Sequence, residues 1–149
     1  MKATGIVLLL LTLASCHTPT ERWLDGMSDY QSVKGKSLTM EIMKIKPAKE
    51  DTTSLTYKIR LYPGKEWTEN NSGRQKNGLF YGMDSCFTLR TTTASYSPDM
   101  IQPVNNGIAG CYEYLLSFGI VKAMKHRQLQ LVYADRYIDG KPYQIVLNR

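Results

Sequence analysis

The chain has 149 residues, of which 42% are hydrophobic and 21% are charged, and its formal net charge is +6 at pH 7. This length suits one domain with a short extension. The basic residues are scattered in pairs and small clusters, which argues against a nucleic-acid site and favours an ordinary solvated surface.

The longest apolar run lies near the start of the sequence, from Ile6 to Leu13. At about eight residues it is far shorter than the roughly 20 that a membrane-spanning helix needs. Lys2 precedes it, and two small residues, Ala14 and Ser15, follow it. A basic start, an apolar middle and a small-residue exit are the parts of a secretory signal peptide, which is expected over residues 1–15.

The tetrapeptide Leu13-Ala14-Ser15-Cys16 resembles the lipobox of bacterial lipoproteins. The resemblance implies that Cys16 carries a diacylglycerol on its thiol and, after cleavage, a fatty acyl group such as palmitate on its amine. More than one acyl chain anchors a protein durably to a membrane. We therefore expect residues 16–36 to be a lipidated tether and residues 37–149 to be the folded domain. The covalent lipid is the only non-protein group expected.

The sequence after Cys16 lacks the acidic cluster that surface-exported lipoproteins of the Bacteroidota tend to carry. By this resemblance the domain would face the periplasm from the outer membrane. Asp51-Thr52-Thr53 also resembles the periplasmic O-glycosylation motif of that phylum, which would make Thr52 the acceptor.

Alternation of apolar and polar residues, typical of half-buried strands, dominates from Ser37 onward. It predicts strands over 37–46 and 55–62, followed by a long exposed loop over 63–78. A further strand, interrupted by a bend near Gly82 and Asp84, is predicted over 79–93, with Leu79, Tyr81 and Met83 on one face. A second long loop is predicted over 94–110.

The last third of the chain predicts a strand over 111–121, a helical turn over 122–127 and two more strands over 128–135 and 141–148. Asp139-Gly140 suits the tight turn between the last two strands, and Asp135 and Asp139 are expected to serve turn geometry. About seven strands without a convincing long helix predict an all-β fold, an immunoglobulin-like β-sandwich.

Residues 84–147 also resemble the immunoglobulin-like (telokin-like) domains of unknown function found in many bacterial lipoproteins. The matching residues are Tyr96, Pro98, Phe118, Leu129, Leu131, Tyr133 and Asp135. The resemblance implies a fold and a location, and brings no catalytic residues.

If Cys16 is lipidated, Cys86 and Cys111 remain as a pair in an oxidising compartment. A disulfide between them would close a loop of about 25 residues and contribute roughly 2–4 kcal/mol. The alternation places both cysteines on the outward faces of their strands, so two free thiols stay open as the alternative. The spacing of cysteines and histidines predicts no metal site.

The sequence shows no catalytic constellation. His126 is the only histidine inside the domain, and no spacing selects a carboxylate pair among Glu66, Glu69, Asp84, Asp99 and Asp135. Four aromatic residues in or beside predicted loops are candidates for a binding surface, namely Tyr62, Trp67, Tyr96 and Tyr137. The sequence therefore favours a non-enzymatic, lipid-anchored subunit that binds another envelope protein, for example in a secretion machine. A glycan-binding module, with Trp67 and Tyr62 as stacking surfaces, and a small periplasmic hydrolase are the alternatives.

Overall fold

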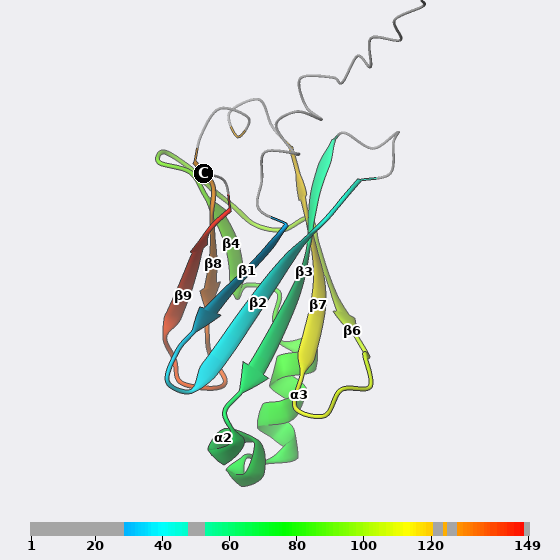
Figure 1. The fold of residues 1–149 in the computed structure, drawn as a ribbon, viewed down its shortest axis with the longest axis vertical. Helices are drawn as coiled ribbons and strands as arrows, with labels where there is room; N and C mark the ends of the chain where they lie inside the picture. Colours follow the sequence, from blue (N-terminus) through cyan, green and yellow to red (C-terminus); the bar gives the residue numbers. More distant parts are fainter. Residues whose placement is uncertain (1–28, 48–52, 121–123, 125–127, 148–149) are drawn as a thin grey trace, which may run out of the picture.

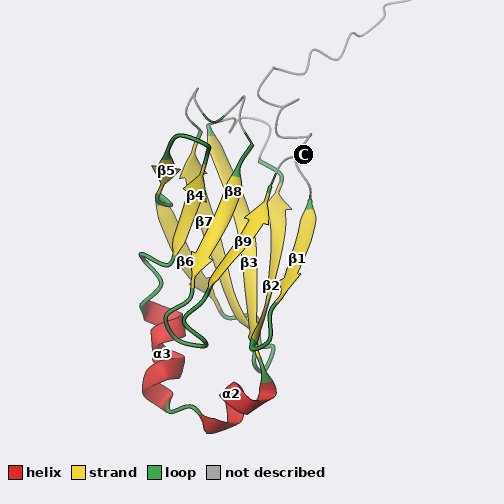
Figure 2. Cartoon of the chain, turned by 90° about the vertical axis from the view of Figure 1, so that its left-hand side faces the viewer, coloured by secondary structure: helices red, strands yellow, loops and turns green. Residues whose placement is uncertain are grey.

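The computed structural model describes residues 29–47, 53–120, 124 and 128–147, which form a sandwich of two antiparallel β-sheets (Figures 1 and 2). The first sheet has the order β1-β2-β3-β7-β6 and the second β5-β4-β8-β9. The strands are β1 Tyr30–Lys34, β2 Leu38–Ile45, β3 Ser54–Pro63, β4 Phe87–Arg90, β5 Ser95–Tyr96, β6 Met100–Val104, β7 Tyr112–Gly119, β8 Gln130–Ala134 and β9 Pro142–Val146. The predicted all-β sandwich is confirmed, whereas kinship with immunoglobulin-like domains stays a prediction.

The core lies between the two sheets and follows the predicted alternation. On β3, every second residue from Leu55 to Leu61 is buried, as expected for a strand with one face toward the core. Three tyrosines, Tyr57, Tyr114 and Tyr133, are fully buried, and the ring of Phe87 stacks on Tyr133 with centroids 5.0 Å apart. Burial of such large apolar surfaces is the main source of stability in a domain of this size.

The folded domain begins earlier than the sequence indicates, because β1 lies inside the range predicted as tether. It pairs with β2 so that Val33 faces Met40. Of the strand's residues, Val33 is the apolar one that packs against the core, while Tyr30 is exposed. An edge strand with one inward apolar residue gives too little alternation to be recognised.

The predicted loop over 63–78 and the first part of the predicted strand over 79–93 are wrong. This segment forms two short helices, α2 Lys65–Asn70 and α3 Gly73–Tyr81. Leu79 and Met83 are buried while Tyr81 between them is 80% exposed. Leu79 and Tyr81 both belong to α3, and residues two apart in a helix point to nearly opposite faces, whereas in a strand they share one face.

The predicted loop over 94–110 is also interrupted by structure, since it contains β5 and β6. Both are edge strands of their sheets. Pro98 and Pro103 argued against strands in this segment, because proline interrupts the hydrogen bonds of a central strand. Proline is tolerated on edge strands, which is where β5 and β6 lie. The predicted tight turn at Asp139-Gly140 is instead part of a longer loop over 135–141 between β8 and β9, in which Gly140 has the expected positive φ of +72°. Most of the helical turn predicted over 122–127 lies outside the described residues.

Four connections gather at one end of the sandwich, which we call the helical end. They are the β1–β2 turn, the α2–α3 segment, the β6–β7 loop and the β8–β9 loop (Figure 1). The first residues of β1 lie toward the opposite end of the sandwich (Figures 1 and 2). Among the helices that the structure describes, none is long and apolar enough to cross a membrane.

Candidate binding surface at the helical end

Trp67, the most prominent predicted binding residue, is part of the core. Its side chain is only 8% exposed, and its indole Nε1 donates a hydrogen bond of 2.8 Å to the carbonyl oxygen of Tyr137. Its ring packs edge-on against Tyr112, with centroids 6.2 Å apart. Trp67 therefore closes the end of the sandwich and offers no open ring face for stacking.

Tyr137 has a structural role as well. Its hydroxyl donates to the carbonyl oxygen of Gly82 at 2.9 Å. Its ring lies so close to Gly78 that a Cβ added there would come within 2.5 Å of the ring, and at Gly82 a Cβ would come within 2.1 Å of the hydroxyl. Both glycines thus permit the close packing that fastens α3 to the β8–β9 loop.

The other two candidates lie elsewhere. Tyr62 is half-buried on the outward face of β3, where burial and then a hydrogen bond with the Cys111 thiol raise its pKa to about 12. Tyr96 is half-buried in β5, opposite Leu89 in the second sheet. Of the four candidates, only Trp67 and Tyr137 are therefore in contact, and the four do not form one surface.

The exposed apolar side chains at the helical end are different ones. Phe80 and Tyr81, at the end of α3, are 38% and 80% exposed, and Ile108 in the β6–β7 loop is 48% exposed. The ring of Phe80 contacts Tyr112 with centroids 5.2 Å apart. Sequence reasoning missed Phe80 and Tyr81 because it assigned them to a strand, where one of the two would point inward.

A groove of about 250 Å³ lies between α3 and the β6–β7 loop. It is lined by Phe80 of α3, by Val104 and residues 105–110 at and after the end of β6, and by Cys111 and Tyr112. We call it the apolar groove. Its size suits the insertion of an apolar side chain from a partner, and aromatic residues such as Phe80 are enriched in protein interfaces.

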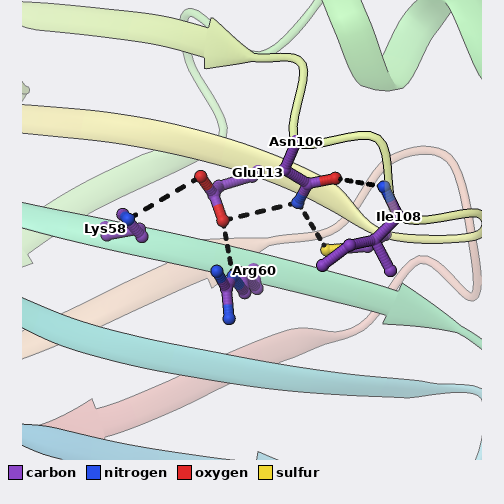
Figure 3. Close-up of polar contacts among 6 residues, drawn as sticks. Lys58, Arg60, Asn106, Ile108 and Glu113 are labelled. Atoms are coloured by element: carbon purple, nitrogen blue, oxygen red, sulfur yellow. Dashed lines mark hydrogen bonds and ion pairs between the residues drawn. The ribbon is translucent and has the colours of Figure 1, made fainter.

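The loop that forms one wall of the groove is held by Asn106 and Glu113 (Figure 3). The Asn106 amide nitrogen donates to the Sγ of Cys111 at 3.1 Å and to Oε2 of Glu113 at 3.4 Å, while its Oδ1 accepts from the backbone N–H of Ile108 at 2.9 Å. The Asn106 side chain therefore ties the loop to the first residues of β7.

Glu113 is 4% exposed although it lies on the outward face of β7. Its Oε2 is 2.5 Å from Nε of Arg60, and its Oε1 is 3.9 Å from Nζ of Lys58. Burial alone would raise the pKa of Glu113, but the bonds from Arg60 and Asn106 outweigh burial and hold the pKa below its usual value. The ionised carboxylate of Glu113 thus anchors the loop. The alternation along β7 would instead have predicted a solvent-exposed side chain at this position.

The described residues contain no group of side chains arranged to hold a metal ion. The two buried carboxylates, Glu113 and Asp135, are surrounded by donors that fix loops. Cys16 and Thr52 lie outside the described residues, as do His17 and His126.

The structure contradicts the Cys86–Cys111 disulfide, since both cysteines are free and buried. Cys86 belongs to the core, where its Sγ lies 3.8 Å from the carbonyl oxygen of Gly82. Cys111 instead accepts a hydrogen bond from the Asn106 amide on the outward face. The two thiols therefore lie on different sides of the first sheet. The alternation placed Cys86 on an outward face, but Cys86 precedes β4 in a turn, so the strand's alternation does not extend to it.

Free thiols make a direct prediction for alkylation. A Cys16→Ala chain, unfolded in guanidinium without reductant, is expected to take up two carbamidomethyl groups, one at Cys86 and one at Cys111. Mass spectrometry of the intact protein would count them. Uptake of none without reductant, and of two after reduction, would establish the disulfide instead.

Comparisons with protein-family models, with curated proteins and with solved structures each returned no match to this chain.

Proposed function

We propose that this protein is a lipid-anchored, non-enzymatic subunit of a cell-envelope assembly, and that it binds another protein through the helical end. The observation that carries the proposal is the apolar groove, with Phe80 and Ile108 exposed in its lining and Tyr81 exposed beside Phe80. Exposed aromatic residues beside a preformed pocket are the usual anchors of protein interfaces.

The arrangement of the chain supports this proposal. A lipid on Cys16 would tether the domain through the residues that lead into β1, and β1 begins toward the end opposite the helices (Figure 1). The helical end would then point away from the membrane, where a partner can reach it. The internal bonds of Asn106 keep the groove wall in place, which lowers the entropy lost on binding.

Photo-crosslinking in intact cells tests the proposal. A photoreactive residue in place of Ala109, which lines the groove, is expected to crosslink the full-length chain to one envelope protein. Tyr81→Ser combined with Ile108→Ser should weaken binding by about thirtyfold and lower the yield accordingly, because truncating interface anchors typically costs more than 1 kcal/mol each. Both side chains are exposed enough for the variant to fold.

Two controls accompany this experiment. A photoreactive residue in place of Val146, on β9, should not capture the same protein. Cys16→Ala should abolish labelling by a fatty-acid analogue and reduce the crosslink. Equal crosslinking with and without the Tyr81→Ser and Ile108→Ser changes would contradict docking at the groove, and persistent labelling of Cys16→Ala would contradict the lipid anchor.

A further inference from the structure

A second depression lies at the helical end, apart from the apolar groove. It lies between the β1–β2 turn and α2 and has a volume of about 550 Å³. Lys36 and Ser37 line it from the turn, and Glu66, Asn70 and Asn71 line it from α2 and its C-terminal end. Gly64, Lys65, Trp67 and Ile138 complete its lining. We call it the polar cleft.

The walls of the polar cleft are fastened to each other and to the domain. The backbone N–H of Gly64 donates to the carbonyl oxygen of Ser37 at 2.8 Å, which joins the β1–β2 turn to the start of α2. The backbone N–H and the side-chain amide of Asn71 donate to the carbonyl oxygen of Trp67 at 3.1 and 2.9 Å. The Trp67 indole is fixed in turn by Tyr137. The cleft is therefore preformed, as binding sites for small ligands usually are.

The groups around the cleft can bond several hydroxyls at once. The Ser37 hydroxyl and the Asn70 amide can both donate and accept, and the Glu66 carboxylate accepts. The Asn71 amide nitrogen is engaged with Trp67, which leaves its carbonyl oxygen as an acceptor. A ligand without hydroxyls would desolvate these groups without bonding them.

The charges at the cleft favour a ligand with an acidic group. Two lysines and one glutamate line it. Lys65 lies 3.6 Å from Glu69 and is 88% exposed, whereas Lys36 has no ion-pair partner within the described part of the chain. An ammonium without a counterion can pair with a ligand carboxylate while the amides bond its hydroxyls.

We propose that the polar cleft binds a short acidic oligosaccharide, with Lys36 pairing its carboxylate and Asn70, Asn71 and Glu66 bonding its hydroxyls. This site differs from a stacking surface on Trp67 and Tyr62, and it is independent of protein docking at the apolar groove. Each activity can therefore fail without the other.

Titration of the full chain with trigalacturonic acid and with the neutral maltotriose tests the proposal, with heat and tryptophan fluorescence as readouts. We expect saturable binding of trigalacturonic acid that weakens as salt is raised, and about fivefold to tenfold weaker binding of maltotriose. Lys36→Ala should weaken binding of the acidic sugar about fivefold, as expected for an exposed charge pair worth roughly 1 kcal/mol. Lys76→Ala, on α3 outside the lining of the cleft, is the matched control and should bind normally.

Three results would overturn the proposal. They are no saturable signal from either sugar up to millimolar concentration, equal binding of both sugars, and equal loss of binding in the Lys36 and Lys76 variants. Lys36 is exposed, so its variant should keep the melting temperature of the wild type. Asn70→Ala gives a second, charge-neutral variant that should weaken binding of both sugars.

Discussion

Replacing Asp135 by Asn is expected to lower the free energy of unfolding by about 3 kcal/mol, because it breaks a buried hydrogen-bond network. Asp135 is 6% exposed and accepts from the Tyr133 hydroxyl at 2.8 Å. Its two oxygens also accept from the backbone N–H groups of Tyr137, Ile138, Asp139 and Gly140. An amide has one acceptor oxygen, and its NH₂ group would face these N–H donors.

The pH dependence of stability should identify the same carboxylate. Burial alone would raise the pKa of Asp135, but the bonds from Asp139, Gly140, Tyr133 and Tyr137 outweigh it and hold the pKa below its usual value. A group with a lowered pKa in the folded state stabilises fully above its unfolded pKa of about 4, and this contribution is lost as the pH falls through the folded value. The difference between wild type and Asp135→Asn should therefore shrink below about pH 4.

Urea unfolding at a series of pH values from neutral to acidic measures both effects. Asp84→Asn is the matched control, since Asp84 is an exposed carboxylate in the turn before β4. It should change the free energy of unfolding by less than about 0.5 kcal/mol at neutral pH. A constant difference between Asp135→Asn and wild type down to strongly acidic pH would show that the carboxylate charge is not the stabilising feature.

Asp135 also illustrates what the sequence can predict. Asp135 was assigned to a turn because it precedes Asp139-Gly140 and lies between two segments of alternating apolar and polar residues. Turn chemistry of this kind is local, so the sequence alone reveals it. The strands β2, β3, β7, β8 and β9 were predicted for a related reason. Each carries enough inward apolar residues at spacing two to exclude a helix.

The rest depends on contacts between distant segments. Trp67 and Tyr137 are 70 positions apart, so neither shows in sequence that the other satisfies its polar group. The sequence alone predicts that Glu113 is exposed to solvent. Its burial becomes clear only in the structure, where Arg60 and Asn106 bond its carboxylate. The α2–α3 segment has few buried residues, chiefly Trp67 and Leu79, and short helices of this kind depend on tertiary packing rather than on propensity. For the same reason, the sequence did not show that Trp67 and Tyr137 pack together while Tyr62 and Tyr96 lie elsewhere.

The second large effect is expected at Trp67, where replacement by Ala should lower the free energy of unfolding by about 4 kcal/mol. The change removes a large buried ring, leaves a cavity beside Tyr112 and leaves the carbonyl oxygen of Tyr137 without the indole donor. Trp67→Phe keeps most of the apolar contact and loses the N–H, so it should cost about 1–2 kcal/mol. Urea unfolding followed by circular dichroism measures both variants without relying on the tryptophan signal.

The pair of variants also separates structure from recognition. Replacement of an exposed side chain usually changes the free energy of unfolding by less than about 0.5 kcal/mol. If Trp67→Ala had so small an effect, the placement of Trp67 in the core would be wrong, and its indole would be free to stack on a ligand. If it is strongly destabilising, loss of sugar binding in the same variant says nothing about stacking, because the wall of the polar cleft is lost with the ring. Lys36→Ala, which leaves Trp67 and its bond to Tyr137 in place, is then the change that distinguishes a ligand contact from a collapsed site.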